Sequence, residues 1–138
     1  MTITQLRKPQ EFVNILYNTF MQKSKVFDMP FGRVYPLLVK KAERKGRTQA
    51  EVDEIITWLC GYSAEEIHRA AEDGTTYGDF FRRAKMNPER IKITGKVCGI
   101  QVEAIQDPLM RDIRYLDKMT DELAKGKKME KILRKAQN

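Results

Sequence analysis

The chain has little of the chemistry that metal sites and disulfide frameworks need. Its 138 residues include two cysteines, Cys60 and Cys98, and one histidine, His68. A structural zinc ion normally takes four cysteine or histidine ligands, so these three separated residues do not predict a zinc site. We expect neither a bound metal nor a cofactor. The cysteines form no C-x-x-C pair, and we expect both to be free, buried thiols.

Long hydrophobic runs are absent as well. No stretch of about eighteen apolar residues occurs, so the sequence predicts no membrane-spanning helix. The first ten residues lack the continuous apolar segment of a secretory signal. We therefore expect a cytoplasmic protein. The length is typical of one folded domain.

What the chain has in excess is basic charge, and that charge is unevenly distributed. The formal net charge is +7 at pH 7. Basic residues outnumber acidic ones ten to three in residues 1–47 and fifteen to eight in residues 81–138, whereas acidic residues lead eight to one in residues 48–80. Two interpretations stay open. Either the acidic middle pairs internally with the basic flanks, or the flanks form a surface for nucleic acid or another anionic partner.

The strongest local signals predict two helices joined by a tight turn at residues 40–62. Gly46 suits a left-handed cap after the first helix, and Thr48 with Glu51 predicts a capping box at the start of the second. Gly61 then ends the second helix. Each helix has one apolar face at i, i+3, i+4 and i+7 spacing. These faces consist of Tyr35, Leu38, Val39 and Ala42 before the turn and of Val52, Ile55, Ile56 and Leu59 after it.

Further cap signals predict helices along the rest of the chain. Ser63 and Thr76 suit the first positions of two short helices, and Asp107-Pro108 suits the start of a long one. Residues 91–97 partly alternate between apolar and polar, which favours an extended segment. The sequence thus predicts an all-α fold, a small orthogonally packed bundle of about six to seven helices with one short extended segment near 91–97.

Residues 1–24 are predicted to form an amphipathic helical extension ahead of a single helical domain at 25–138. A basic amphipathic helix can lie on a membrane surface, but more often it docks on its own domain or on a partner. We therefore expect this stripe to contact a protein partner or a second copy of the chain. The stripe consists of Phe12, Ile15, Leu16 and Phe20.

Several motifs between Val26 and about Arg134 form a recognisable set. They are YPLLVKKAERKGRT, EVDEIITWLCGY, ITGKVCGIQVEAI, DPLM and IRYLDKMTDELAKGKKMEKILR. In these motifs the chain resembles the bacterial family called domain of unknown function 2200. The resemblance implies a small all-helical domain in a bacterial cytoplasmic protein, and it implies no activity. The chain departs from the family pattern at Leu38, Cys60, Gln101 and Gln106.

No triad, carboxylate dyad or phosphate-loop spacing appears in the sequence, so we name no catalytic residue. His68 has no partner at a spacing that would make it a general base. The leading hypothesis is a non-enzymatic binding or regulatory module. Its candidate binding residues are the basic and aromatic side chains of the helical pair, namely Lys41, Arg44, Lys45, Arg47, Trp58 and Tyr62.

Two alternative functions stay open. The first is a nucleic-acid-binding protein that presents the basic helix-turn-helix at 40–62 to phosphates. The second is a small-molecule enzyme whose pocket gathers dispersed side chains such as Asp53, Asp112 and Tyr115. A structure in which those three side chains converge would favour the enzyme.

Overall fold

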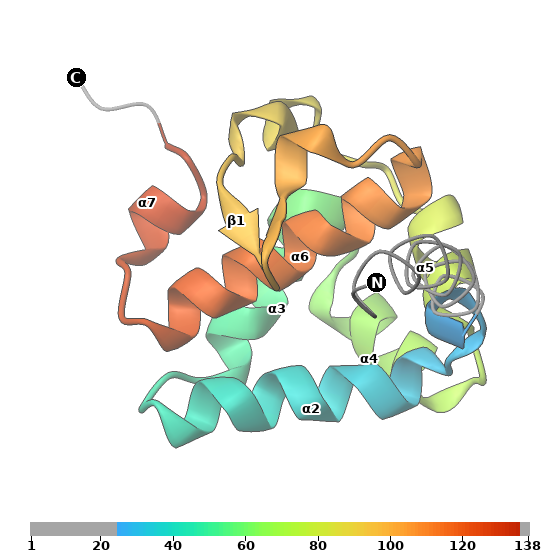
Figure 1. The fold of residues 1–138 in the computed structure, drawn as a ribbon. Coiled ribbons are helices and arrows are strands. Elements are labelled where there is room, and N and C mark those ends of the chain that lie inside the picture. Colours follow the sequence, from blue (N-terminus) through green and yellow to red (C-terminus); the bar gives the residue numbers. More distant parts are fainter. Residues whose placement is uncertain (1–24, 136–138) are drawn as a thin grey trace, which may run out of the picture.

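A computed structural model describes residues 25–135, and helices make up most of this part of the chain (Figure 1). The longer helices are α2 (Phe31–Arg44), α3 (Gln49–Cys60), α4 (Ala64–Glu72) and α6 (Pro108–Ala124). The shorter ones are α5 (Tyr77–Arg82), α7 (Met129–Ile132) and the 3-10 helices η1 (Pro88–Lys92) and η2 (Val102–Ala104). The all-α prediction is therefore confirmed. The predicted extension 1–24, with its apolar stripe Phe12, Ile15, Leu16 and Phe20, lies outside the described residues.

The extended segment is shorter than the predicted range. Strand β1 (Lys96–Val97) pairs antiparallel with β2 (Ile100–Gln101). The two residues between the strands have positive φ, 52° at Cys98 and 77° at Gly99, as a tight two-residue hairpin turn requires. This turn exposes Cys98, so the expectation that both thiols are buried was wrong for Cys98 and right for Cys60.

The helical pair at the centre of the sequence forms as its local signals predicted. The Thr48 hydroxyl accepts from the Glu51 amide at 3.1 Å, and the Glu51 carboxylate accepts from the Thr48 amide at 2.9 Å. Gly46 and Gly61 both have φ of 78°, a conformation that costs glycine little. The predicted apolar face of α3 is fully buried. Its members Val52, Ile55, Ile56 and Leu59 are each 0% exposed.

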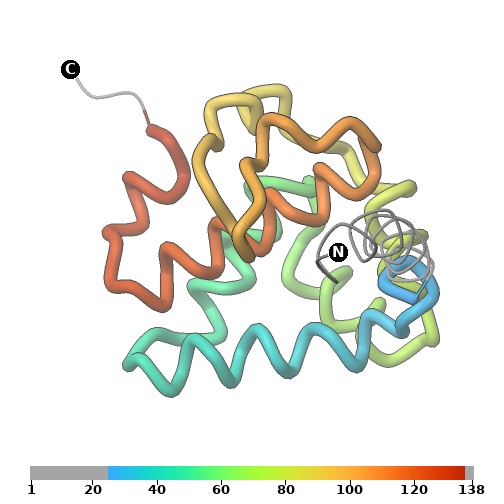
Figure 2. The backbone as a smooth tube through the Cα atoms, in the orientation of Figure 1, coloured from blue at the N-terminus to red at the C-terminus, as the bar shows by residue number. Residues whose placement is uncertain are grey.

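Helix α6 runs through the middle of the molecule, and it contacts α2, α3, α5, α7 and β1 (Figures 1 and 2). Its inward face is almost wholly removed from water. Ile113, Leu116, Met119 and Leu123 form that face, and none of them is more than 1% exposed. Burying an aliphatic side chain contributes roughly 1.5–3 kcal/mol, so this face is a main source of stability.

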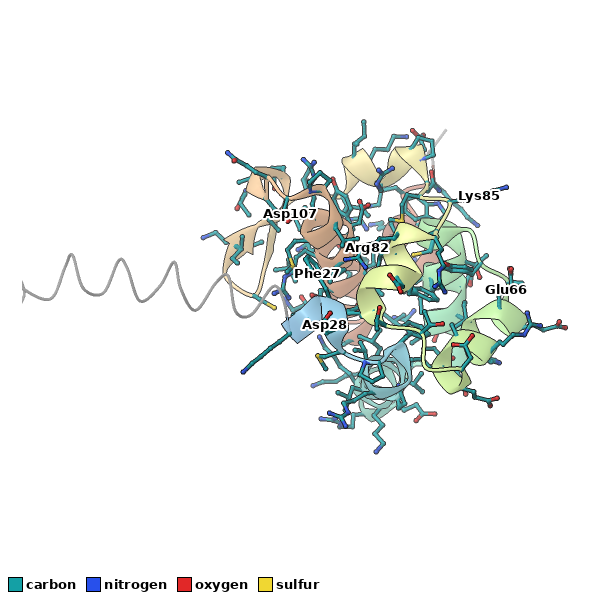
Figure 3. All side chains as sticks on the ribbon, turned by 90° about the vertical axis from the view of Figure 1, so that its right-hand side faces the viewer. Phe27, Asp28, Glu66, Arg82, Lys85 and Asp107 are labelled. Atoms are coloured by element: carbon teal, nitrogen blue, oxygen red, sulfur yellow. The ribbon has the colours of Figure 1, made fainter. Side chains whose placement is uncertain are left out.

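A cluster of aromatic rings fills the part of the core between α2 and α5. Phe31 on α2 stacks on Phe80 of α5 with 3.9 Å between ring centroids, and the Tyr35 ring lies 5.6 Å from Phe31. Beside this cluster, the Arg82 guanidinium lies 5.9 Å from the centre of the Phe27 ring (Figure 3). The ring contacts join α2 to α5, which are distant in sequence.

The described part of the chain, residues 25–135, contains no helix that combines the length and the apolar character needed to cross a bilayer.

We predict that Gly32→Ala destabilises the fold. A Cβ atom at Gly32 would lie 2.1 Å from the Ala71 carbonyl oxygen of α4, so α2 and α4 would have to separate. In a helix this substitution normally stabilises, whereas overpacking of this kind costs about 1–3 kcal/mol. Urea unfolding followed by circular dichroism measures the change. Arg33→Ala, at the next and exposed position, is the control and should change stability by under about 0.5 kcal/mol. Equal stabilities for the two variants would contradict the close helix crossing.

Candidate functional site

Two surface hollows adjoin along the C-terminal half of α6. One, of about 480 Å³, lies at the turn from α6 into α7, and the other, of about 530 Å³, lies between α6, α2 and the hairpin. Asp121 and Lys125 line both hollows, so the two lie side by side. We name this surface the basic groove and define it by the basic residues that line it. They are Lys41, Lys96, Arg114, Lys118, Lys125, Lys127, Lys128 and Lys131.

The groove concentrates most of the excess charge of the chain. Eight basic residues line it, against the three acidic residues Asp117, Asp121 and Glu122. The groove therefore has an excess of five positive charges, and the net charge of the whole chain is +7. The fold therefore gathers basic residues from both flanks of the sequence around two adjacent hollows.

Asp121 lies at the point where the two hollows meet. Its carboxylate is 3.0 Å from the Lys125 Nζ and 3.5 Å from the Lys41 Nζ, so it joins the end of α6 to α2. Burial alone would raise the pKa of Asp121, but the two lysines outweigh it and hold the pKa below its usual range. Asp121 therefore remains charged at neutral pH.

The other two acidic residues of the groove are also paired. Asp117 is 2.7 Å from the Arg114 guanidinium, and burial raises the pKa of Asp117 despite the opposing charges of Arg114 and Lys41. Glu122 is 5% exposed and accepts from Lys127 at 3.2 Å and from Arg134 at 2.9 Å. The Glu122 contacts fix the segment after α6 against α6 itself.

The hairpin wall of the groove is held by hydrogen bonds between side chains and its backbone. The Lys118 Nζ on α6 donates to the Lys96 carbonyl at 3.1 Å, and the Gly95 amide donates to the Glu103 carboxylate at 3.1 Å. Ion pairs and hydrogen bonds thus position the walls of the groove on the α6, α2 and hairpin sides.

Arg47, a predicted binding residue, is engaged within the protein. Its Nη1 donates to the carbonyl oxygens of Lys127 at 2.8 Å and Leu123 at 3.2 Å, and its Nη2 donates to Glu51 at 2.8 Å. These bonds join the α2–α3 turn to the end of α6. We name this set of contacts the Arg47 clasp.

The structure places the other predicted binding residues in different surroundings. Lys41 lines the basic groove, whereas Arg44 and Lys45 are exposed at the end of α2 and have no ion pair within residues 25–135. Trp58 and Tyr62 are half-buried against the core. The Tyr62 hydroxyl donates to the Phe80 carbonyl at 2.7 Å. Only Lys41 of the six predicted residues therefore lines the groove.

The dispersed side chains proposed for an enzyme pocket belong to separate networks. Asp53 accepts from the Tyr35 hydroxyl and contacts the His68 Nε2 at 2.9 Å, which gives His68 a positioned partner that sequence spacing did not reveal. Burial, with Asp53 adding to it, raises the pKa of Tyr35. Asp112 instead pairs with Arg90 at 2.9 Å.

None of the three proposed enzyme residues, Asp53, Asp112 and Tyr115, lines the hollows of the basic groove. In residues 25–135 there is also no group of three or more His, Cys, Asp or Glu side chains placed to hold a metal ion.

Sequence reasoning did not select the groove lysines that follow the middle of α6. A usable signal was present, because basic residues surround Gly126 on both sides. Only the turn into α7 and the position of the hairpin bring Lys96 and Lys131 to the same surface.

Comparison with known proteins places the chain among bacterial proteins without an assigned activity. The model of the DUF2200 family, described as an uncharacterized protein conserved in bacteria, matches residues 25–134. The chain belongs to this family. The matched range includes every residue of the basic groove.

A solved structure supports the fold of this DUF2200 member. The crystal structure of uncharacterized protein SP1917 is 47% identical in sequence, with a TM-score of 0.77. The match covers 80% of this chain and 92% of that chain. The comparison with curated proteins found no match.

We predict that Arg47→Gln destabilises the protein by about 1–3 kcal/mol, because it removes the Arg47 clasp. The loss should depend on pH. The hydrogen bond from Arg47 is the main reason that the pKa of Glu51 lies below its usual range. The stabilisation that this bond gives is therefore present above the usual pKa of a glutamate, and it is lost as the pH falls through the lower pKa that Glu51 has in the folded protein.

Urea titrations at pH 7 and at about pH 3 measure this effect. The difference between the wild type and Arg47→Gln should shrink at the lower pH, where Glu51 becomes protonated. Arg44→Gln removes the same charge from an exposed side chain and should have little effect at either pH. A loss of similar size in both variants would contradict the clasp.

Proposed function

We propose that this DUF2200 protein is a non-enzymatic binding module that holds the phosphate backbone of duplex nucleic acid in the basic groove. The observation that carries the proposal is a pair of adjacent hollows lined by eight basic residues from several elements. Lysine and arginine that neutralise phosphates supply most of the sequence-independent affinity for nucleic acid.

The composition of the groove supports a phosphate ligand. Seven of the eight basic residues are lysines, which act on phosphate as point charges and do not impose the bidentate geometry of arginine. The three carboxylates of the groove are held in ion pairs. This arrangement favours charge recognition over acid–base chemistry.

The length of the groove supports an extended ligand over a single small anion. Arg114 and Lys125 are eleven residues apart along α6, a separation of about 16 Å at the helical rise. One strand of a duplex advances about 3.4 Å per nucleotide along the duplex axis, so a groove parallel to that axis spans about five nucleotides. Lys127, Lys128 and Lys131 extend the track further toward α7.

The side chains lining the groove also favour a duplex over a single strand. Proteins that hold single strands commonly stack the bases on aromatic rings. None of the described residues that line the basic groove is aromatic. Contacts to phosphates alone position a protein on a duplex without reading its sequence.

This proposal differs from the helix-turn-helix alternative in the surface that it uses. Arg47 of the turn is committed to the Arg47 clasp, so the proposed phosphate contacts lie beside the turn and share only Lys41 with it. A protein partner at residues 1–24 and a cytoplasmic location remain predictions alongside it.

We predict that the protein binds a mixed-sequence duplex of about twenty base pairs with an affinity that falls steeply with salt. Fluorescence anisotropy at several salt concentrations gives the slope of log affinity against log salt. Lys128→Glu with Lys131→Glu should lower that slope by about two and weaken binding at least about tenfold, because each lysine neutralises about one phosphate. Both side chains are exposed.

The matched control is Arg69→Glu with Lys85→Glu, which changes the net charge equally. Neither residue lines the groove, and the Lys85 side chain projects outward from the molecule (Figure 3). This variant should bind nearly as tightly as the wild type. Equal losses in the two variants would assign binding to net charge alone, and no binding by the wild type at low salt would overturn the proposal.

We also predict that a bound duplex protects Cys98 from alkylation. Cys98 lines the hollow beside the hairpin, whereas Cys60 is fully buried, so only Cys98 should react quickly with uncharged iodoacetamide. Mass spectrometry should show a slower Cys98 reaction when a saturating duplex is present. An unchanged rate with duplex bound would place the ligand elsewhere on the molecule.

A further inference from the structure

Asp121 carries a negative charge at the centre of a surface that we assign to an anionic ligand. Its Oδ1 faces the Lys41 Nζ at 3.5 Å, and its Oδ2 faces the Lys125 Nζ at 3.0 Å. One carboxylate therefore bridges lysines from α2 and from the end of α6, with one oxygen for each. A phosphate with two free oxygens could make the same two contacts.

We infer that Asp121 is an internal counter-anion, which a bound phosphate backbone displaces from Lys41 and Lys125. The inference rests on the proposed function. It assigns to Asp121 a specificity-determining role for the ligand of the basic groove.

The exposure of the three side chains allows this exchange. The side chain of Asp121 is 27% exposed, that of Lys41 is 46% exposed and that of Lys125 is 74% exposed. Ion pairs with this much contact to water contribute little free energy. Both lysines can therefore turn to a ligand without a large change in the fold.

The same exchange favours long anions over small ones. A single small anion that replaces Asp121 gains two lysine contacts while two lysine contacts to Asp121 are lost. A phosphate backbone that also reaches Lys96, Lys128 and Lys131 gains contacts that no carboxylate of the groove occupies in the described residues. Displacing Asp121 thus costs the same free energy for both ligands, and only the long ligand makes further lysine contacts that offset this cost.

The test is duplex binding by Asp121→Asn, measured by anisotropy across a salt series. Neutralising Asp121 should raise affinity by roughly fivefold, the equivalent of one partly exposed ion pair, and should steepen the salt slope by at least about one. Glu130→Gln is the matched control. It removes one negative charge from the exposed face of α7, where Glu130 holds no groove lysine, and should change affinity by less than about twofold.

A double-mutant cycle separates displacement from long-range charge effects. Lys41→Gln should weaken duplex binding more in the Asp121→Asn background than in the wild type, because Lys41 is occupied by Asp121 only in the wild type. The same cycle with Lys125→Gln repeats the test from the other lysine. Circular dichroism confirms folding of each variant, and Asp121→Ser repeats the neutralisation with another side chain.

The outcomes for Asp121 and for the groove are distinguishable. Duplex binding by the wild type that is unchanged or weaker in Asp121→Asn would overturn the displacement role and leave the proposed function standing. An effect of Lys41→Gln that is equal in both backgrounds would also overturn it. No duplex binding by either the wild type or Asp121→Asn would instead overturn the proposed function.

Discussion

The Arg47 clasp is the contact on which the shape of the basic groove depends. It binds the turn after α2 to the backbone at the end of α6, through the carbonyl oxygens of Leu123 and Lys127. Lys41 lies in the last turn of α2, and Lys127 begins the segment that leads into α7. One guanidinium therefore contributes to the relative position of the two sides of the groove, and its pairing with Glu51 holds it in that orientation.

The groove combines two opposing electrostatic requirements. Lys41 and Lys125, at the C-terminal ends of α2 and α6, interact favourably with the helix dipoles, but placing eight basic residues around the groove generates mutual repulsion. Asp117, Asp121 and Glu122 relieve that repulsion in the folded protein. The same carboxylates reduce the positive potential that a polyanion would meet. Stability of the free protein and affinity for the proposed polyanion are therefore in competition within this site.

The parts of the fold that sequence predicted are those that depend on neighbours along the chain. The Thr48–Glu51 capping box, the Gly46 turn and the buried face of α3 each follow from residues within one or two helical turns. The groove could not be predicted in this way, because Lys41 and Lys96 meet only after the helices pack. The same applies to His68 and Asp53, which lie on different helices. The prediction that Cys98 is buried was wrong, because the hairpin turn determines its exposure and an apolar pattern does not.

The central position of α6 has a consequence for how the chain reaches its native state during synthesis. Helices α2, α3 and α5 all pack on α6, yet residues 108–124 are translated after all three. Helices α2 to α5 also pack on one another, but the parts of their buried faces that contact α6 have no native partner until residues 108–124 have left the ribosome, since chains are made from the N-terminus. We expect the core to be completed only when α6 packs, and a nascent chain that stops before α6 to expose apolar surface to chaperones.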